Sequence, residues 1–171
     1  MELLFTIHLR YSSDIDIGGS MDSIDRQIIS ILQKNARSSI SEIGARVNLS
    51  IPATSDRIRK IEAAGIITQY TAIVNPAALN LKLTALMFIS LEKPHFSEYF
   101  VSFVNTQDEI LECNYLAGDF DYVMKIVTEN TETLEKLLTR VKSVPGVQKT
   151  QTIITLCTVK NIHSVLPKEP V

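Results

Sequence analysis

The chain has few of the residue types that build disulfides, metal centres or membrane spans. Its 171 residues include no tryptophan, two cysteines and three histidines. Neither cysteine has a second Cys or His at metal-ligand spacing, so Cys113 and Cys157 are predicted to be buried, reduced thiols. No apolar run approaches the roughly 20 residues of a spanning helix, and the N-terminus lacks signal-peptide features. We therefore expect a cytoplasmic protein with no metal, no cofactor and no membrane partner.

A large excess of charge of one sign is also missing. The formal net charge is -2, which argues against an overall basic coat for nucleic acid. Residues 21–65 nevertheless hold seven Lys and Arg against five Asp and Glu, whereas residues 66–171 hold nine against eleven. The first 20 residues hold one against three. The small basic surplus therefore points to residues 21–65 as the place for any nucleic-acid-binding surface.

Three helices are predicted between Asp22 and Gly65 from apolar residues at helical spacing. Ser39 and Glu42 form a capping box, and Pro52 stands in a first helical turn, where its missing N–H costs nothing. The predicted start and stop residues are, in chain order, Asp22 and Asn35, Ser39 and Asn48, and Ser50 and Gly65. Because only three residues separate the last two helices, the segment is predicted to be a helix-turn-helix.

The rest of the chain alternates between strand and helix signals. The segment "IITQYTAIV", residues 66–74, is β-branched and alternating and is predicted to be a strand. After it the predicted order is β-α-β-β-α-β, a ferredoxin-like arrangement. The predicted strands are 83–91, 110–116, 122–127 and 147–159, and the helices cover 96–104 and 134–141. The two middle strands should form a hairpin across Gly118 and Asp119.

The predicted fold class is α+β, in two domains. A three-helix, winged-helix-like DNA-binding domain (21–67) is followed by a linker strand and turn (68–82), a ferredoxin-like ligand-sensing and dimerisation domain (83–160) and a tail (161–171). Residues 1–20 are turn-rich and acidic and are predicted to be a disordered extension. The alternative for the extension is a short edge strand from Leu3 to Leu9.

The first strand of the second domain is apolar on both faces. Leu83, Ala85, Met87, Ile89 and Leu91 alternate with Leu86 and Phe88. Helices cover only one face of such a sheet, so we expect the other to pack on a second copy in an isologous dimer. The alternative is that the linker strand or the N-terminal extension covers it.

The third helix, Ser50 to Gly65, has small residues early on its outer face and cations later. This order suits entry into a DNA major groove, where base edges need close approach and phosphates need charge. The candidate DNA contacts from this pattern are Arg37, Arg57, Arg59 and Lys60, with Ser39 and Ser50 placing helix N-termini against the backbone. Asp56 on the same face argues for the alternative, an ordinary solvated surface.

The chain resembles the Lrp/AsnC family of feast/famine transcription regulators from Met21 to about Lys160. The resemblance is carried by the start "MDSIDRQII", the turn "NLSIP", the helix exit "RIRKIEAAGII" and the loop "AGDFDY". It implies binding of double-stranded DNA, dimers that assemble into a higher homo-oligomer, and an amino-acid effector. By position, the implied DNA-facing set is Ser50, Pro52, Ala53, Thr54, Arg57 and Arg59.

The resemblance also implies an effector site between dimers, around the turn Leu116 to Asp121. Gly118 would let backbone amides approach a ligand carboxylate, and Asp119 or Asp121 would accept from its amino group. The expected site residues are Leu116, Gly118, Asp119, Phe120, Asp121, Thr150 and Thr152. From the residues alone, an ordinary hairpin turn, for which Gly-Asp is a common choice, is the preferred interpretation.

The expected function is thus a DNA-binding, effector-responsive transcription regulator, and not an enzyme. Asp119 and Asp121 are paired carboxylates, but no His, Cys or Lys near them completes a catalytic constellation. The alternative function is a protein-interaction adaptor or a ligand-sensing module without DNA binding.

Overall fold

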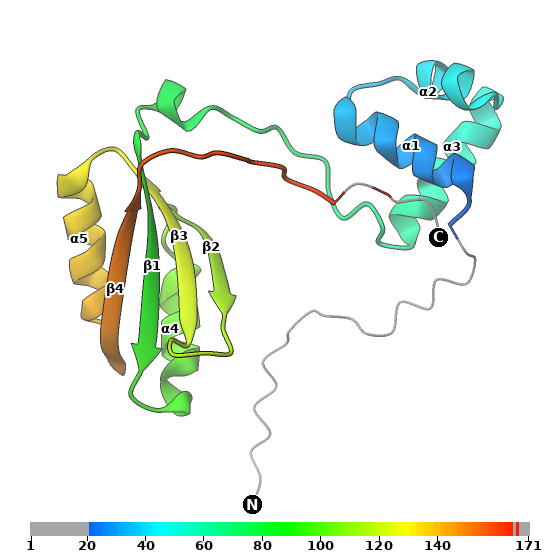
Figure 1. Ribbon diagram of the computed structural model, residues 1–171. Helices are drawn as coiled ribbons and strands as arrows, with labels where there is room; N and C mark the ends of the chain where they lie inside the picture. The colour runs from blue at the N-terminus through cyan, green and yellow to red at the C-terminus, as the bar shows by residue number, and fades with distance from the viewer. Residues whose placement is uncertain (1–20, 166, 168–171) are drawn as a thin grey trace, which may run out of the picture. The chain divides into compact units, whose positions relative to one another are not determined.

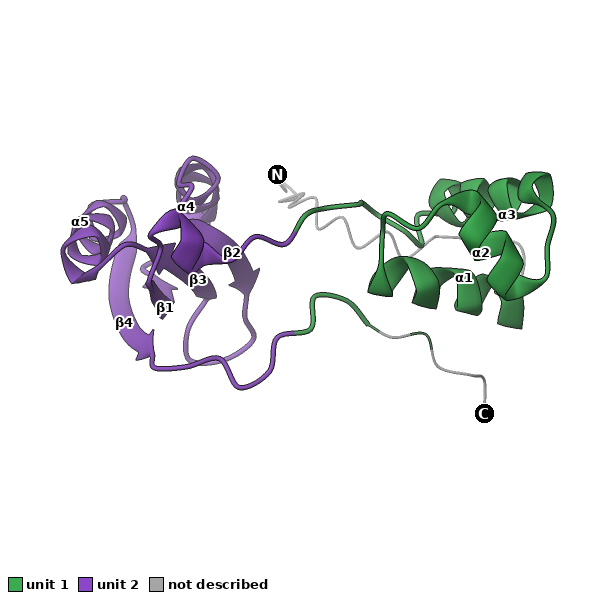
Figure 2. Ribbon diagram, turned by 90° about the horizontal axis from the view of Figure 1, so that it is seen from above, with its two compact units in different colours: residues 1–72, 162–171 green, residues 73–161 purple. Residues whose placement is uncertain are grey.

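The computed structural model describes residues 21–165 and 167, so the predicted extension, its alternative strand Leu3 to Leu9 and the end of the tail lie outside the described residues. The chain divides into two compact units, shown in Figure 2. The first comprises residues 1–72 and 162–171, and the second comprises residues 73–161.

The first unit contains the three predicted helices, α1 (Ser23–Lys34), α2 (Ile40–Val47) and α3 (Ile51–Ala63), as Figure 1 shows. Each begins where the sequence predicts, because the side chains of Asp22, Ser39 and Ser50 accept a hydrogen bond from a backbone N–H three residues later. Left-handed residues follow α2 and α3, Asn48 at φ 56° and Gly65 at φ 67°. The helices enclose a core of Ile28, Ile29, Leu32, Ile43, Val47 and Ile61. The predicted helix-turn-helix is confirmed.

Gly44 of α2 lies against the turn that precedes α3 and against Thr54 in the first turns of α3. A Cβ atom placed there would lie 2.8 Å from the carbonyl oxygen of Leu49 and 2.9 Å from Oγ1 of Thr54. The missing side chain therefore lets the turn between α2 and α3 close tightly over α2. The angle at which α3 is presented depends on this contact.

The predicted strand at residues 66–74 is wrong. The segment is extended but joins no β-ladder among residues 21–165. An isolated strand has no neighbour for its N–H and C=O groups, and its β-branched composition cannot supply one. The segment is anchored at Tyr70, whose hydroxyl donates to Oε1 of Glu62 on α3 at 2.8 Å. A short 3₁₀ helix, Pro76–Leu79, then ends at Asn80, which is left-handed at φ 62°.

The second unit has the predicted ferredoxin-like order. Its elements are β1 (Leu83–Leu91), the 3₁₀ turn Pro94–Phe96, α4 (Ser97–Val104), β2 (Ile110–Tyr115), β3 (Tyr122–Thr128), α5 (Thr131–Lys142) and β4 (Val147–Thr155). The antiparallel sheet has the order β2-β3-β1-β4. Both helices cover one face of it (Figure 2) and bury Phe100, Leu137 and Val141 against the central strands.

The last strand is shorter than predicted. β4 ends at Thr155 rather than at residue 159, and Cys157 beyond it is exposed. The prediction of a buried thiol is therefore wrong for Cys157, because the β1–β4 pairing ends at Thr84 and Thr155, two residues before it. Cys113 on β2 is half-buried, and burial raises the pKa of its thiol to about 11.

The two faces of the sheet differ as the alternation of β1 predicts. Ala85, Met87 and Ile89 are fully buried under the helices. On the other face, which no helix of the second unit covers, Leu86 is 37% exposed and its β4 neighbour Ile153 is 47% exposed. An apolar sheet face is thus left open to solvent in the single chain.

Candidate DNA-binding surface and effector site

The beginning of α3 forms an exposed, capped helix N-terminus. Ser50 and Pro52 are exposed and Ala53 is half-buried, and the large side chain among these small residues is Ile51, which is 56% exposed. Ser50 Oγ accepts from the N–H of Ala53 at 3.4 Å, and Ser39 Oγ accepts from the N–H of Glu42 at 3.2 Å. Both serines therefore fix helix N-termini at the surface, where such ends favour anions.

Thr54 does not belong to this surface, which corrects its place in the predicted DNA-facing set. Its side chain is fully buried, and its hydroxyl donates to the carbonyl oxygen of Ser50 at 2.9 Å. Residue 54 lies on the helix face that packs against α2, beside Gly44. A match by position to the family pattern cannot bring a buried hydroxyl to DNA.

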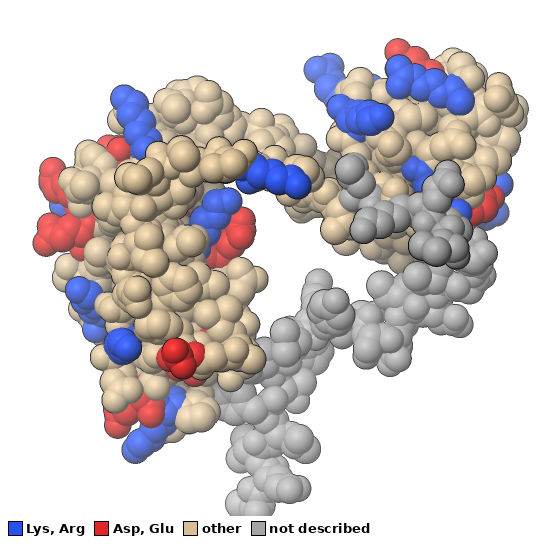
Figure 3. Space-filling view, viewed as in Figure 1, with Lys and Arg blue, Asp and Glu red and all other residues tan. Residues whose placement is uncertain are grey.

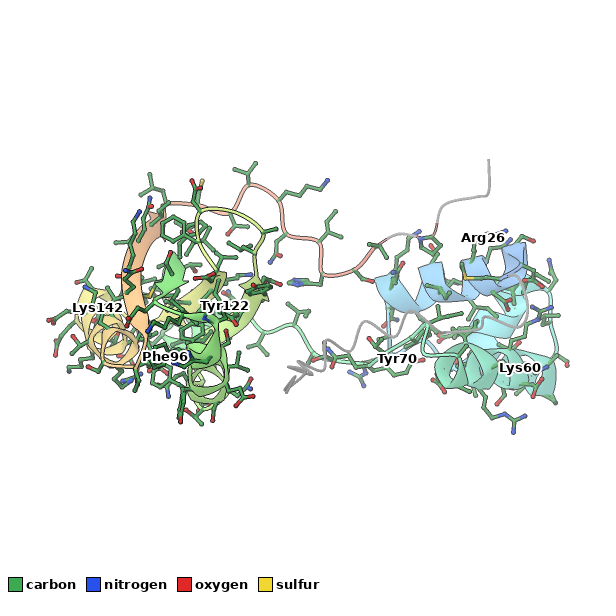
Figure 4. All side chains as sticks on the ribbon, turned by 90° about the horizontal axis from the view of Figure 1, so that it is seen from below. Arg26, Lys60, Tyr70, Phe96, Tyr122 and Lys142 are labelled. Atoms are coloured by element: carbon green, nitrogen blue, oxygen red, sulfur yellow. The ribbon has the colours of Figure 1, made fainter. Side chains whose placement is uncertain are left out.

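The cations on the outer face of α3 share one carboxylate. Asp56 accepts from Arg59 and, at 2.9 Å, from Lys60, and these hydrogen bonds lower the pKa of Asp56. The side chains of Arg59 and Lys60 remain 78% and 74% exposed. Lys60 lies on the side of the unit away from α1 (Figure 4). Exposed pairs of this kind are weak, so both cations can exchange Asp56 for a phosphate.

Arg57 occupies a different environment from the one that the sequence predicts. Its Nη1 donates to Asp22 Oδ2 at 2.7 Å and to Asp25 Oδ1 at 2.8 Å, and its side chain is only 31% exposed. Helical spacing places Arg57 on the flank of α3, but it cannot show that the start of α1 lies against that flank. The structure therefore corrects Arg57 from a free cation to an ion-paired one.

Two further exposed polar residues of α2 and α3 were missed by the sequence interpretation. Ser55 lies one helical turn before Arg59, and Arg46 lies in the last turn of α2. The i, i+4 spacing to Arg59 is the signal that could have found Ser55. Arg37, in the turn between α1 and α2, is exposed as a phosphate contact requires. Figure 3 shows Lys and Arg side chains gathered over the helix-turn-helix unit.

The turn between β2 and β3 is fixed to the end of β1 by its backbone and by Asp121. The N–H of Leu116 donates to the carbonyl oxygen of Asp121 at 2.8 Å, and the N–H of Asp121 donates to Ile89 at 2.8 Å. Asp121 Oδ2 accepts from the N–H of Leu91 at 2.7 Å. One oxygen of Asp121 is therefore used to hold the turn in place.

Asp119 and Gly118 form the exposed tip of this turn. The Asp119 side chain makes no hydrogen bond or ion pair within residues 21–165, whereas its carbonyl accepts from Ser90 Oγ at 3.3 Å. A Cβ on Gly118 would meet nothing within 4 Å, and the residue is not left-handed. Neither steric crowding nor the backbone conformation within the chain requires glycine at residue 118. Because Gly118 has no side chain, its backbone is accessible to a bound ligand or a second chain.

Thr150 and Thr152 do not lie on the same sheet face as Phe120, which corrects the predicted pocket. Thr150 pairs with Ile89 and Thr152 with Met87, both buried on the helix-covered face. Phe120 instead packs on Phe88 of the uncovered face, with ring centroids 5.5 Å apart. The sequence shows which residues of β4 alternate, but not which set shares a face with the turn.

Lys149 is the β4 residue that the structure brings to Phe120. Its Nζ lies 5.0 Å from the centroid of the Phe120 ring, within cation–π range. Lys149 pairs with Ser90 in the β1–β4 ladder, so it stands next to the tip of the turn. The ammonium of Lys149 and the ring of Phe120 thus lie together beside the turn that carries Asp119.

A separate cavity of about 450 Å³ lies between the end of α4 and β2. It contains neither predicted site, and its lining residues are Val104, Asn105, Gln107, Asp108, Ile110, Leu111, Glu112 and Cys113. Within residues 21–165 and 167, no group of three or more His, Cys, Asp or Glu side chains is placed to hold a metal ion. No described helix is both long and apolar enough to cross a membrane.

A capped helix-turn-helix joined to a ferredoxin-like domain defines a two-domain transcription regulator. Residues 21–62 match the AsnC-type helix-turn-helix domain, and residues 84–165 match the Lrp/AsnC ligand binding domain. The chain belongs to the Lrp/AsnC family and is a DNA-binding transcriptional regulator of that type.

Curated relatives cover most of the chain. It is 39% identical over 141 residues to the HTH-type transcriptional regulator FL11 of Pyrococcus abyssi, covering 82% of this chain and 93% of that protein. It is 36% identical over 154 residues to the leucine-responsive regulatory protein of Escherichia coli K12, covering 88% and 94%. These relatives are transcriptional regulators and not enzymes.

Solved structures agree with the fold. A transcriptional regulator of Neisseria meningitidis in complex with L-Met has a TM-score of 0.82 at 30% identity, covering 85% of this chain and 96% of that one. The feast or famine regulatory protein of M. tuberculosis complexed with L-methionine has a TM-score of 0.79 at 28% identity, covering 86% and 100%.

Proposed function

We propose that this protein regulates transcription in response to an amino acid, binding DNA as a dimer or higher homo-oligomer through the outer face of α3. The observation that carries the proposal is the exposed, capped start of α3 followed by the cations Arg59 and Lys60. Small residues near the helix start allow approach to base edges, and the later cations reach phosphates. The proposed DNA-facing set is Arg37, Ser39, Ser50, Pro52, Ala53, Arg59 and Lys60, with Ser55 and Arg46 added.

The amino-acid effector is assigned to the turn Leu116 to Asp121. Asp119 is the acceptor for the ligand's ammonium group, and Lys149 is a donor for its carboxylate. Phe120 supplies an apolar surface beside them. Support comes from two relatives of known structure that were solved with methionine.

The dimer is assigned to the uncovered sheet face, which carries Leu86, Phe88 and Ile153. A Phe88→Glu variant is expected to weaken dimerisation by about 100-fold or more, because it places an unpaired carboxylate in the middle of the sheet face that the dimer would bury. Light scattering coupled to size-exclusion chromatography would show the shift to monomer. Tyr99→Glu, on the exposed side of α4 at 63% exposure, is the matched control and should remain a dimer. Equal masses for the two variants would exclude this face.

The proposed function is tested by binding purified protein to fragments of its own genome at two salt concentrations, with and without a mixture of free amino acids. We expect enrichment of particular fragments that weakens steeply with salt and shifts when amino acids are added. No enrichment under any condition would favour the adaptor function instead. Enrichment without an amino-acid response would retain the regulator and exclude the effector.

A further inference from the structure

We infer that Arg57 is a positioning residue rather than a DNA contact: it fastens α3 to the start of α1 through Asp22 and Asp25, and so sets the angle at which the outer face of α3 is presented. The inference rests on the proposed assignment of that face to DNA. It gives a role to a cation that is directed toward the start of α1.

The two carboxylates use all four oxygens, two for capping and two for Arg57. Asp22 Oδ1 accepts from the N–H of Asp25 at 2.9 Å, and Asp25 Oδ2 accepts from the N–H of Asp22 at 3.2 Å. The remaining oxygens, Asp22 Oδ2 and Asp25 Oδ1, both accept from Arg57 Nη1. The contact that begins α1 is therefore also the contact that holds α3.

Electrostatics favour this arrangement. Two like charges three residues apart repel each other, and the N-terminus of α1 and the guanidinium of Arg57 offset that repulsion. The hydrogen bond from the N–H of Asp25 and the one from Arg57 lower the pKa of Asp22. Hydrogen bonds to Asp25 and Asp22 raise the pKa of Arg57. Without Arg57 the capping box would keep two carboxylates with no cation.

The ion pairs of Arg57 join two helices that are far apart in the sequence. Arg57 lies four residues before Ile61, the α3 side chain buried in the shared core, and next to Ile58, which packs against that core. Its partners are 32 and 35 residues away in the sequence. By contrast, Arg59 and Lys60 pair only within their own helix. Of these three cations, Arg57 alone joins α3 to another helix.

The test compares variants for which the two roles predict opposite results. Arg57→Met removes the cation, Asp25→Asn removes one acceptor charge while keeping an oxygen for the cap, and Arg57→Lys keeps the charge. The double variant Asp25→Asn/Arg57→Met completes the cycle. The probe is a fluorescent duplex of mixed sequence, about 40 base pairs long so that it spans several helical turns, titrated at several salt concentrations. The temperature is one at which circular dichroism shows every variant folded.

If Arg57 positions α3, Arg57→Met and Asp25→Asn should each weaken duplex binding by about five- to tenfold. The double variant should be no more than about twofold worse than either single one, and Arg57→Lys should recover part of the loss. If Arg57 instead contacts a phosphate, Arg57→Met alone should flatten the salt dependence, by about 0.9 in slope per phosphate. Asp25→Asn should then bind as well as or better than the wild type, because a negative charge near DNA is gone.

If Asp25→Asn binds the duplex as tightly as the wild type or more tightly, the positioning role of Arg57 is overturned. Independent, additive losses in the double variant would overturn it as well. A wild-type protein that binds no duplex at any salt concentration would instead overturn the proposed DNA surface, and the role of Arg57 with it. The two failures are thus separate results.

Discussion

Replacing Gly146 with alanine is expected to lower the free energy of unfolding of the second unit by roughly 2–5 kcal/mol. Gly146 has φ 85°, which costs an alanine about 1–2 kcal/mol. Its Cβ would also lie 2.0 Å from Cγ and 2.3 Å from Cδ2 of Phe96, which Figure 4 labels. The turn cannot retreat freely, because the carbonyl of Gly146 accepts from the N–H of Glu92 at 2.7 Å.

Urea unfolding followed by tyrosine fluorescence would measure this loss, since Tyr99, Tyr115 and Tyr122 lie in the second unit. Gly118→Ala is the matched control, because its Cβ meets nothing within 4 Å and its backbone is not left-handed. It should change the free energy of unfolding by less than about 0.5 kcal/mol. Adding Phe96→Ala to Gly146→Ala removes the contacts with the ring, but the contact with Cβ of residue 96, at 2.4 Å, and the backbone strain remain, so only part of the loss should be recovered. A Gly146→Ala protein as stable as Gly118→Ala would contradict the packing described for this turn.

The triple variant Arg37→Ala/Arg59→Ala/Lys60→Ala is expected to weaken duplex DNA binding by roughly 100-fold or more at moderate salt. The salt dependence should flatten by about 0.9 in log–log slope for each phosphate that the variant can no longer neutralise. The variant also leaves Asp56 without its two cationic partners, so a net negative group would face the phosphates. Fluorescence anisotropy over a series of salt concentrations would give both the affinity and the slope.

The control for that variant carries the same change of net charge on exposed lysines of the second unit, Lys93→Ala/Lys142→Ala/Lys160→Ala. Its affinity for the duplex should stay within about threefold of the wild type, because these lysines are not part of the proposed DNA-binding surface and exposed charges that contact no phosphate are screened by salt. Similar losses in the two triple variants would mean that net charge, and not the surface of α3, binds DNA.

The local structure of the first unit could be predicted because its signals are local. Ser39 with Glu42, Ser50 with Pro52, and Gly65 each specify a helix end within one turn of chain. The same reasoning failed for residues 66–74, because a strand needs a partner that its own sequence does not contain. A period-2 pattern establishes which residues alternate and not whether a neighbouring strand exists.

The errors at the two sites have the same origin. Thr54 and Arg57 lie on α3 where helical spacing places them, but their partners come from α2 and α1. Thr150 and Lys149 are adjacent in the sequence, and only the register of β4 on β1 shows that Lys149 shares the face of Phe120. The sequence predicts the helices and strands themselves, but not which of their faces contact one another.

The carboxylate of Asp56 behaves as a counterion that is tethered between Arg59 and Lys60. Random DNA offers these cations only phosphates, and each phosphate must displace a partner that is always present. A target site adds contacts to base edges, which offset the cost of the exchange. Because the exchange lowers the affinity for every sequence alike, we expect the proposed surface to hold random DNA only briefly and to depend on base-edge contacts for stable binding.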